Sequence, residues 1–243
     1  MAIEHDVITA KLCRHSELDE QDIAALRTLP VQSRKLRPNE DFIHQGDRPK
    51  LSALVTSGVV ARYHLLRGGK RQYLSFHMTG DMPDAQTLFI ERMDHAVCAI
   101  GEAVIALIPH EKICDIFKRR PEVGFAIWRE TLIDAAIFRE AITNNSSRPP
   151  IARMAHLFSE LYYRARAAGL TKPGSCRLPF HQGQIGEALA MSIVTVNRTL
   201  QTLRRTKAME FRNGVLTVFD WRKLVEAGEF DANYLNLKKP ARL

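Results

Sequence analysis

Five side chains in the last third of the chain are spaced as neighbours on one face of an α-helix, at i, i+3, i+4, i+7 and i+11. They are Val194, Asn197, Arg198, Gln201 and Arg205. In the major groove of DNA, arginine can bind guanine through two hydrogen bonds, and asparagine or glutamine can bind adenine in the same way. Such a helix would present base-reading side chains to a duplex, provided that its opposite face is apolar and anchored.

The opposite face is apolar, and it carries Val196, Leu200 and Leu203. A first helix is expected just before it, with Ile185 and Leu189 pointing inward, and a tight turn at residues 190–191 joins the two. Ser192 follows this turn as a good N-cap for the second helix. The pattern predicts a helix-turn-helix, a motif whose second helix enters the major groove.

A hairpin is predicted immediately after the second helix. Residues 210–218 read EFRNGVLTV, in which Asn213-Gly214 is the strongest two-residue hairpin signal. A β-hairpin here would make the motif a winged helix-turn-helix, and Arg212 at its tip would contact phosphate, which positions a protein without reading sequence. With the start of the first helix added, the DNA-binding candidates are Ser192, Val194, Thr195, Asn197, Arg198, Gln201, Arg205, Arg212, His181 and Gln182.

The chain carries a formal net charge of +8 at pH 7, and the excess is confined to one end. Residues 148–243 hold 16 Lys and Arg against 7 Asp and Glu, whereas residues 1–147 hold 19 against 20. A basic half joined to a neutral half indicates a polyanionic partner for the basic half alone. Its coincidence with the helix-turn-helix favours double-stranded DNA as that partner over a solvated basic surface with no partner.

The elements ahead of this half begin with a short helix expected over residues 17–29, with Ser16 as its possible cap. Turn signals then recur at regular intervals, with glycines at positions 46, 58, 69 and 80. Between them lie β-type runs at residues 54–55, 59–64 and 72–76, and residues 96–108 add one or two buried strands. Short strands separated by glycine turns are typical of a small sandwich or barrel.

Helical periodicity returns after Pro109, with a short helix over residues 110–119 and a long one over residues 122–145. The long helix carries Ile127, Ile133 and Ile137 outside its main apolar stripe. The stripe itself supplies the dimerisation candidates Phe125, Trp128, Leu132, Ala135 and Ile142. A small β domain can cover only one face of such a helix, so the second face is predicted to form the seam of a homodimer. A helix buried within one chain is the alternative.

The clearest break in the chain is the polar run at residues 144–147, followed by Arg-Pro-Pro at residues 148–150. Ser146 or Ser147 could cap the helix predicted over residues 151–169. Because this break coincides with the step in charge, we place the domain boundary there. The β domain is then expected at 1–120, the dimerisation helix and hinge at 121–146, and the DNA-binding domain at 147–243.

Taken in order, these features resemble the cyclic-AMP-receptor/FNR superfamily of bacterial transcription regulators. The resemblance spans residues 15–225 and rests on the QGD and GD turns at 45–47 and 80–81, the long helix, the polar break, RPPIARMAHLF at 148–158 and QIGEALAMSIVTVNRTLQTLRR at 184–205. It implies an α+β fold with an N-terminal cyclic-nucleotide-binding-type β-roll (jelly roll), a long central dimerisation helix and a C-terminal winged helix-turn-helix.

The resemblance also implies a function and assigns roles in the recognition helix. The function would be sequence-specific regulation of transcription by a homodimer on a palindromic operator, with RNA polymerase as a further partner. The family's recognition pattern maps onto Ser192, Val194, Thr195, Asn197 and Arg198. Arg198 is implied to bind guanine in each half-site. Where the family often has a glutamate, this chain has Val194, which offers only an apolar contact, for instance to a thymine methyl, and this puts the usual half-site in doubt.

Cyclic AMP does not match the residues that this resemblance would assign to it. The position of the ribose-binding glutamate falls on Ala85, and the phosphate-binding Arg-Ser pair falls on Met93-Asp94, or on Arg92-Met93 with a shift of one residue. A buried carboxylate such as Asp94 would repel a cyclic phosphate. We therefore disfavour cyclic AMP as the ligand of the sensor domain.

Two other cofactors known in such sensors are disfavoured as well. An iron–sulfur cluster needs four thiolates, and Cys13 stands alone near the N-terminus. Haem would need Cys98, Cys114, His77 or His95 as an axial ligand, and a lone histidine in a β domain more often has a structural role. The ligand, if there is one, stays unassigned.

Two other classes of protein share some of these features. A cupin-like metal enzyme would need converging histidines, and the candidates His44, His64, His77 and His95 lack its paired spacing, so we expect no enzyme. A protein that binds nucleic acid without sequence preference would need only the basic half. The four cysteines form no CxxC pair, and no apolar run reaches the length of a signal peptide or membrane span, which predicts a soluble cytoplasmic protein without a metal site.

Overall fold

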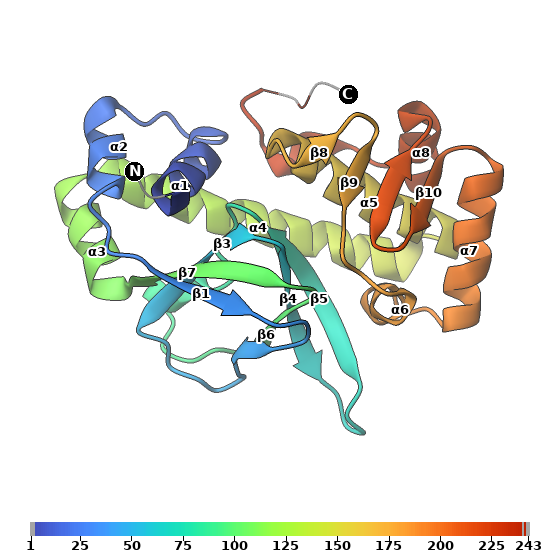
Figure 1. Ribbon diagram of the computed structural model, residues 1–243, viewed down its shortest axis with the longest axis horizontal. Coiled ribbons are helices and arrows are strands. Elements are labelled where there is room, and N and C mark those ends of the chain that lie inside the picture. The colour runs from blue at the N-terminus through green and yellow to red at the C-terminus, as the bar shows by residue number, and fades with distance from the viewer. Residues whose placement is uncertain (1–2, 240, 242–243) are drawn as a thin grey trace. The chain divides into compact units, whose positions relative to one another are not determined.

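The chain forms two compact units, Met1–Ala135 and Ala136–Leu243, in a computed structural model that describes residues 3–239 and 241 (Figure 1). The division falls inside the long helix α4, which spans Pro121–Ser147. The domain boundary that we place near residue 146 follows composition and charge, and it stays a prediction. We call the two parts the first unit and the second unit.

The first unit is a β-roll made of two antiparallel sheets. One sheet has the order β1-β7-β3 and the other has the order β2-β6-β4-β5. The strands are β1 (Gln32–Leu36), β2 (Asp41–Ile43), β3 (Leu51–Ser57), β4 (Val59–Leu65), β5 (Arg71–Met78), β6 (Ala96–Ala99) and β7 (Ala103–Pro109). The predicted β domain is therefore confirmed. Sequence patterns missed β1, which is mostly polar and exposed, and β2, which has only three residues.

The turn between β3 and β4 shows why one of the regularly spaced glycines is needed. Gly58 has a φ of +83°, and a Cβ atom at this position would lie 2.5 Å from the carbonyl oxygen of Glu102. Any other residue would be strained in this backbone conformation and would also collide with the neighbouring strand. Gly58 thus allows β3 and β4 to pack closely beside β7.

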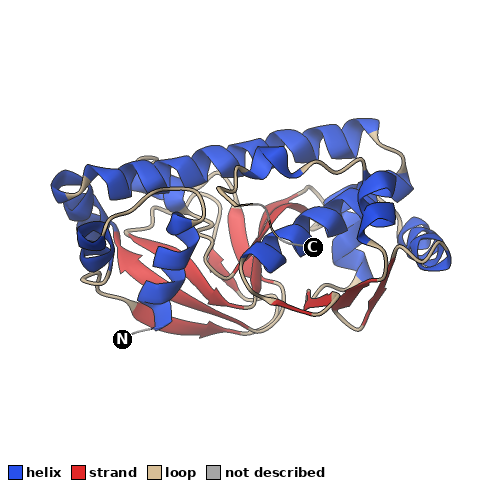
Figure 2. Cartoon of the chain, turned by 90° about the horizontal axis from the view of Figure 1, so that it is seen from above, coloured by secondary structure: helices blue, strands red, loops and turns tan. Residues whose placement is uncertain are grey.

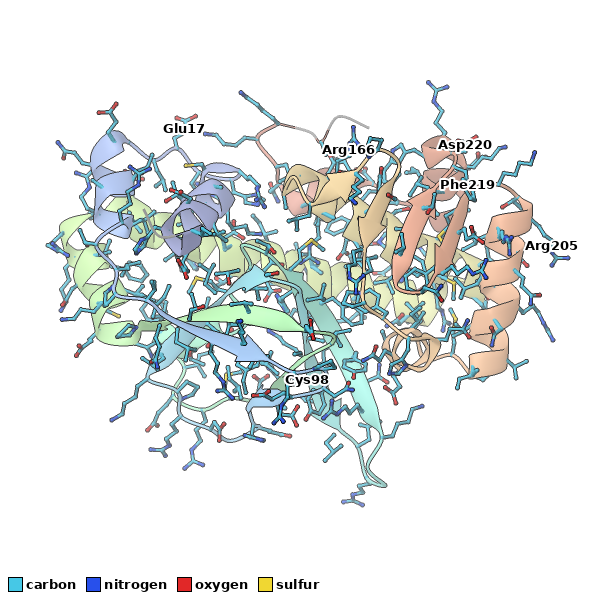
Figure 3. All side chains as sticks on the ribbon, viewed as in Figure 1. Glu17, Cys98, Arg166, Arg205, Phe219 and Asp220 are labelled. Carbon is cyan, nitrogen blue, oxygen red and sulfur yellow. The ribbon has the colours of Figure 1, made fainter. Side chains whose placement is uncertain are left out.

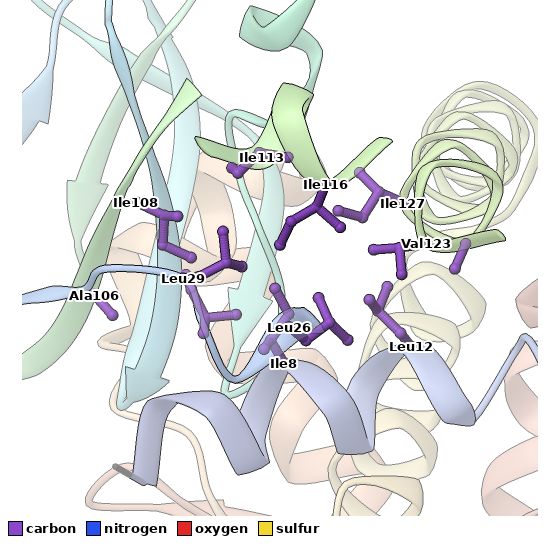
Figure 4. Packing of buried hydrophobic residues seen from close by; sticks show 12 residues of the cluster. Ile8, Leu12, Leu26, Leu29, Ala106, Ile108, Ile113, Ile116, Val123 and Ile127 are labelled. Atoms are coloured by element: carbon purple, nitrogen blue, oxygen red, sulfur yellow. The ribbon is translucent and has the colours of Figure 1, made fainter. Parts of the chain in front are cut away.

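Among the described residues, two hydrophobic clusters hold the first unit together. One fills the roll between its sheets and includes Val55, Val60, Val97 and Ile105. The other lies on the outer face of the sheet β1-β7-β3, where helices α1 (Ile3–Cys13), α2 (Glu20–Leu26) and α3 (His110–Arg119) pack with the start of α4 (Figure 4). β3 and β7 are thus buried on both faces, which explains their almost continuous apolar sequences.

The N-terminal helices differ from the expectation in two respects. α1 has no counterpart in the sequence-based prediction, and α2 is capped by Asp19 instead of Ser16. Asp19 and Asp22 form a reciprocal capping box, in which each carboxylate accepts a hydrogen bond from the other residue's backbone N–H. The Ser16 hydroxyl instead accepts a hydrogen bond from Arg129 of α4, at 3.0 Å.

The polar run at residues 144–147 does not interrupt the helix, because α4 continues to Ser147. Asn144 is buried, and its amide donates a hydrogen bond to the carbonyl oxygen of Arg153. Asn145 donates in the same way to the carbonyl oxygen of Ala188. These two amides satisfy backbone acceptors within the second unit, so the polar composition reflects packing and not a break in the helix.

The second unit packs a small sheet and further helices around helix α5 (Pro150–Ala167). Figure 2 shows the strands and helices of the chain in separate colours. α5 begins with proline in its first turn, as predicted, but without a side-chain cap, because Ser146 and Ser147 still belong to α4. The sheet has the order β10-β11-β9-β8. The other elements are β8 (Thr171–Lys172), β9 (Ser175–Arg177), α6 (Gln182–Leu189), α7 (Ile193–Arg205), β10 (Met209–Arg212), β11 (Val215–Val218), α8 (Trp221–Gly228) and the short 3-10 helix η2 (Ala232–Leu235).

Candidate nucleic-acid interface

The turn between α6 and α7 has the tight geometry of a helix-turn-helix. Ala190 adopts the left-handed conformation, and the backbone N–H of Met191 donates to the carbonyl oxygen of Gly186 at 2.9 Å. A Cβ atom on Gly186 would lie 2.7 Å from the carbonyl oxygen of Met191. Gly186 is therefore required for this turn, and sequence reasoning did not single it out, although a glycine inside a helical pattern often marks such a close backbone approach.

Both helices of the motif are capped by side chains. The Ser192 hydroxyl accepts a hydrogen bond from the backbone N–H of Thr195 at 3.2 Å, which confirms the predicted N-cap of α7. At the start of α6, the His181 ring accepts from the backbone N–H of Gln184, and the Gln184 side chain accepts from the backbone N–H of His181. The N-terminal ends of α6 and α7 are thus held in defined positions with Gln182 and Ser192 exposed.

α7 divides into the two predicted faces. Val196, Leu200 and Leu203 are buried, and Ile185 and Leu189 of α6 are buried as well. On the outer face, the exposed candidates are Val194, Arg198, Gln201 and Arg205, while Thr195 and Asn197 are half-buried. Figure 3 shows Arg205 extending from the outer side of α7.

The polar groups on this face differ in how far they are already engaged. The Asn197 amide donates to the carbonyl oxygen of Ile193, at 3.1 Å, so its donor is directed to its own helix. In the described part of the chain, the Arg198 guanidinium and the Gln201 amide have no hydrogen-bond partner or ion pair. Arg198 and Gln201 therefore keep their full bonding capacity for a ligand.

The start of α7 also exposes two β-branched apolar side chains. Ile193 is 58% exposed and Val194 is 68% exposed. Val194 was among the predicted candidates, and Ile193 was not, although it lies one turn before Asn197. Its position directly after the N-cap Ser192 could have indicated that it is exposed at the start of the helix.

The predicted wing is present as the hairpin of β10 and β11. Asn213 and Gly214 both have positive φ angles, 52° and 71°, as a type I′ turn requires. Arg212 is exposed beside this turn. The other two strands of the sheet, β8 and β9, were missed, although the Pro-Gly pair at residues 173–174 between them is a turn signal.

The apolar stripe of α4 is exposed along the helix. Four of its members are 51–68% exposed, namely Phe125, Trp128, Leu132 and Ile142. Ala135 is half-buried in the same stripe. The opposite side of the helix is buried through Val123, Ala126, Ile127 and Ile133. α4 therefore packs by one face and leaves a second apolar face open.

Of the four residues at the cyclic-nucleotide positions, Arg92 is exposed, and the other three do not fit that ligand. Ala85 is buried in the 3-10 helix η1 (Ala85–Leu88), and Met93 is buried in the core of the roll. Asp94 is 81% exposed and binds His95, so our expectation of a buried carboxylate at this position was wrong. None of these three side chains offers a donor to a cyclic phosphate.

Arg62 and Asp84 are two ionisable side chains that the roll does bury. Arg62, on β4, is 3% exposed, and its guanidinium donates to Pro83, to Gln86 and to Asp134 of α4. Asp84 accepts from the backbone N–H of Ala53, and burial raises the pKa of its carboxyl group to about 7. Asp84 also borders a cavity of about 380 Å³.

The cysteines and histidines show no metal-binding arrangement. Among the described residues, no group of three or more His, Cys, Asp or Glu side chains could hold a metal ion. Burial raises the pKa values of the Cys98 and Cys176 thiols to about 12, which keeps them protonated. The His77 ring forms a hydrogen bond with the Ser75 hydroxyl group. The described chain also lacks any helix long and apolar enough to cross a membrane.

Comparisons with known proteins agree with this architecture. Residues 33–120 match the cyclic nucleotide-binding domain, and residues 152–227 match the Crp-like helix-turn-helix domain. The chain is 21% identical to the fumarate and nitrate reduction regulatory protein of Vibrio cholerae over 91% of this chain and 88% of that protein. It is 22% identical to the transcriptional activator protein FnrA of Stutzerimonas stutzeri over 88% of both chains.

A solved structure shows the same fold over most of the chain. FixK2 from Bradyrhizobium japonicum superposes with a TM-score of 0.74 at 21% identity, covering 82% of this chain and 98% of FixK2. The two matched domains, the relatives and the fold all agree with the geometry described above. The chain belongs to the cyclic-AMP-receptor/FNR superfamily and is a DNA-binding transcription regulator.

Proposed function

We propose that this regulator binds a palindromic operator as a homodimer, with α7 of each subunit in the major groove. The observation that carries the proposal is the division of α7 into a buried apolar face and an outer face on which Arg198 and Gln201 are exposed and unpaired. A second observation is the net positive charge of residues 148–243. Charge attracts the phosphate backbone, while the outer face of α7 supplies groups that can read base edges.

Arg198 is the central base-reading residue in this proposal. It lies one turn into α7, close enough to the groove floor to bind guanine through two hydrogen bonds. Gln201 lies one turn further along and can bind adenine in the same manner. Asn197, with its amide donor bound to Ile193, accepts through its oxygen, and Arg205 at the end of the helix contacts phosphate.

The ends of the two helices supply the phosphate contacts that set the register. Helix N-termini attract phosphate through their free N–H groups, so Ser192 and Thr195 at α7 and His181 and Gln182 at α6 are placed for this role. Arg212 on the wing adds a further phosphate contact. These contacts orient the protein without selecting a sequence.

Val194 and Ile193 predict an apolar element in the half-site. Side chains of this kind contact the methyl group of thymine, which no other DNA base carries. We therefore infer a thymine next to the guanine read by Arg198.

The dimer is formed by the open apolar face of α4. Phe125, Trp128, Leu132, Ala135 and Ile142 follow a spacing close to that of a two-stranded coiled coil. Parallel pairing of two α4 helices would cover this stripe and would supply two copies of α7 for a palindrome. Symmetry of the protein is then mirrored in the operator.

The first unit acts without cyclic AMP in this proposal, because its residues do not fit that ligand and Arg62 is engaged by protein groups. We assign the protein no catalytic role. RNA polymerase is the partner that a promoter-bound regulator would contact, and the cytoplasm is where the operator is found.

The test is selection of bound sites from random DNA, followed by two variants measured on the selected palindrome, on a palindrome with one changed base pair, and on unrelated DNA. Arg198→Ala should weaken binding to the palindrome by roughly 1–3 kcal/mol per half-site and relax preference at one position. Arg212→Ala should weaken binding to all three DNAs about equally and lower the salt dependence by about one phosphate contact per subunit.

Two outcomes would count against the proposal. If no palindrome is recovered, the protein binds DNA without the proposed symmetry. If Arg198→Ala loses the same factor on all three DNAs, Arg198 is a phosphate contact, and base reading belongs to Asn197 and Gln201.

A further inference from the structure

We propose that the segment after α8 fixes the angle between α4 and α5, and so sets the distance between half-sites that a homodimer accepts. We call residues 229–237 the C-terminal clasp. This inference rests on the proposed binding of a palindrome by a homodimer. The clasp lies beyond the matched Crp-like helix-turn-helix domain, which ends at residue 227. The domain match therefore assigns it no role.

The clasp begins where the end of α8 packs directly on the backbone of α5. A Cβ atom on Gly228 would lie 2.5 Å from the backbone nitrogen of His156. The carbonyl oxygen of Gly228 accepts a hydrogen bond from Nδ1 of the His156 ring at 3.0 Å. Glu229 then adopts the left-handed conformation. Further along, the Tyr234 hydroxyl donates to the Glu160 carboxylate of α5 at 2.8 Å. Both ends of this stretch are therefore attached to α5.

An apolar cluster holds the clasp against three helices. Phe230 and Leu235 are 7% and 2% exposed, and with Tyr163 of α5 they form the buried centre of the cluster. Ile137 of α4 and Trp221 of α8 pack against this centre. The Phe230 ring centroid lies 5.9 Å from that of Tyr163 and 6.0 Å from that of Trp221. Because one cluster contains side chains from α4, α5 and α8, burial of the clasp holds the three helices together.

Ion pairs make the same connection at the junction between α4 and α5. The two helices are separated by residues 148 and 149 alone, so the junction is a single short hinge. The Arg148 guanidinium lies 2.7 Å from the Glu140 carboxylate of α4 and 3.4 Å from the Glu229 carboxylate of the clasp. The Arg148 side chain is only 12% exposed, which limits screening of these ion pairs by solvent. Arg148 thus joins α4, the hinge and the clasp.

The angle at this hinge matters because the two helices carry different parts of the proposed DNA complex. The end of α4, from Ala136 onward, belongs to the second unit and includes Ile142 of the proposed dimer seam. α5 packs against the recognition helix α7. A change in the angle between α4 and α5 would therefore alter the distance and the rotation between the two α7 helices of a dimer. Since half-site spacing reflects the distance between recognition helices, a fixed hinge restricts binding to one spacing.

The test uses three palindromes with the same selected half-sites, one with the selected spacing and two with one base pair added or removed between the half-sites. One base pair turns a half-site by about 34° and moves it by about 3.4 Å. The wild-type protein should bind the altered spacings roughly 30-fold more weakly, because the DNA or the protein must be deformed. In Phe230→Ala, which removes the centre of the clasp, this penalty should fall to roughly threefold, because α5 can then move about the hinge.

A milder variant and a matched control accompany this substitution. Tyr234→Phe removes only the hydroxyl that binds Glu160 and should lower the spacing penalty by roughly twofold. Tyr162→Phe is the control, since Tyr162 is also buried in the second unit and its hydroxyl makes no hydrogen bond within the described residues. It should keep the wild-type penalty. If Phe230→Ala does not fold, the comparison of these two hydroxyl deletions decides the question.

A duplex with one half-site separates loss of spacing control from loss of folding. Each folded variant should bind it as tightly as the wild type does, because the outer face of α7 is unchanged. The inference is overturned by a folded Phe230→Ala variant that keeps the full spacing penalty, and equally by one that loses the same factor on every DNA. The proposed function fails differently, through a wild-type protein that binds a palindrome no more tightly than a single half-site.

Discussion

Arg62 in the first unit and Arg198 in the second unit carry the same guanidinium group in opposite surroundings. Arg62 is 3% exposed and donates to Pro83, Gln86 and Asp134. Arg198 is exposed, and the described chain offers its guanidinium no partner. The first arginine is engaged by its own fold, and the second keeps its donors for another molecule.

The contrast extends beyond these two residues. In the first unit, Lys11 binds Asp81 and Glu130, and Arg120 binds Asp19 and Asp22. In the second unit, the cations on α7 and on the outer face of the sheet lack carboxylate partners within the described residues, apart from Arg204. Part of the step in net charge along the sequence therefore comes from second-unit cations that the described chain does not pair. Other cations of that unit, such as Arg148 and Arg164, form ion pairs with Glu140 and Glu160.

The largest effect is expected from a substitution in α4, the helix that both units share, and it is loss of the dimer. Leu132→Asp should convert the dimer to a monomer, because two aspartates would face each other where the proposed seam buries two leucines. Burying a whole leucine side chain contributes about 1.5–3 kcal/mol, and Leu132 is 51% exposed, so two copies together contribute about 1.5–3 kcal/mol to dimer stability before the repulsion and desolvation of two carboxylates are added. Analytical ultracentrifugation at micromolar concentration measures this directly.

Exposure makes Leu132→Asp a test of association and not of folding. Leu132 is 51% exposed in the single chain, so the variant subunit should keep its thermal unfolding profile when measured as a monomer. Glu122→Ala, at an exposed position outside the stripe, serves as the control and should remain dimeric. A wild-type protein that sediments as a monomer would refute the predicted seam.

Arginine-to-alanine changes in the two units should have opposite consequences. Arg62→Ala leaves Asp134 without its buried cation and should lower the free energy of unfolding by about 3 kcal/mol. Arg198→Ala removes an exposed, unpaired side chain and should change it by less than about 0.5 kcal/mol, while specific DNA binding falls. Denaturant unfolding of both variants, with DNA binding measured in parallel, separates the two roles.

A second pair of substitutions sharpens this result. Combining Arg62→Met with Asp134→Leu replaces the ion pair by apolar side chains of similar size, and should recover most of the stability lost in Arg62→Ala. If Arg62→Ala proves as stable as the wild type, the buried ion pair contributes nothing to the free energy of unfolding. Arg62 and Arg198 would then differ in burial but not in their contribution to stability.

A substitution in the turn of the helix-turn-helix should change stability less, and only in the second unit. In Gly186→Ala, the new Cβ atom would lie 2.7 Å from the carbonyl oxygen of Met191, so α6 and α7 must separate slightly. We expect a loss of about 1–3 kcal/mol in the free energy of unfolding. DNA binding should fall further than stability alone explains, because the angle of α7 changes. Ala188→Gly, in the same helix, is a control that perturbs helix propensity without a collision.

Several elements of the second unit could be predicted from the sequence alone. The helix-turn-helix, its Ser192 cap and the Asn213-Gly214 hairpin follow local rules, in which a few residues determine the conformation, and all three are present. The exposed stripe of α4 was recognised for the same reason, because helical periodicity assigns each residue to a face.

What the sequence did not reveal depends on partners far along the chain. β1 is exposed and polar, and it exists because it pairs with β7, about seventy residues later. The polar run ending α4 was read as a break, since the carbonyl groups that Asn144 and Asn145 bind belong to Arg153 and Ala188. Asp94 was expected to be buried and Asp84 was not considered, because no local pattern reports burial in a loop.

The smallest change in stability is expected from two carboxyl groups, a buried one in the first unit and a half-buried one in the second. Burial raises the pKa of Asp84 to about 7, so the folded protein holds a proton that the unfolded chain releases near pH 4. Its contribution to stability is therefore greatest below about pH 4 and declines as the pH rises to about 7. Asp220, the N-cap of α8, has the opposite shift, because the backbone N–H of Lys223 lowers its pKa.

Asp84→Asn should flatten the decline, so that its free energy of unfolding relative to the wild type rises between pH 5 and pH 7.5 by about 1–3 kcal/mol. Asp220→Asn should leave the pH dependence of unfolding between pH 5 and pH 7.5 unchanged. It should lower the free energy of unfolding throughout this range, because the wild type loses the contribution of the Asp220 carboxylate only at more acidic pH. Urea unfolding at half-unit steps from pH 4 to pH 8 measures both differences. Parallel profiles for wild type and Asp84→Asn would mean that Asp84 is ionised at neutral pH and that the Arg62 charge outweighs burial.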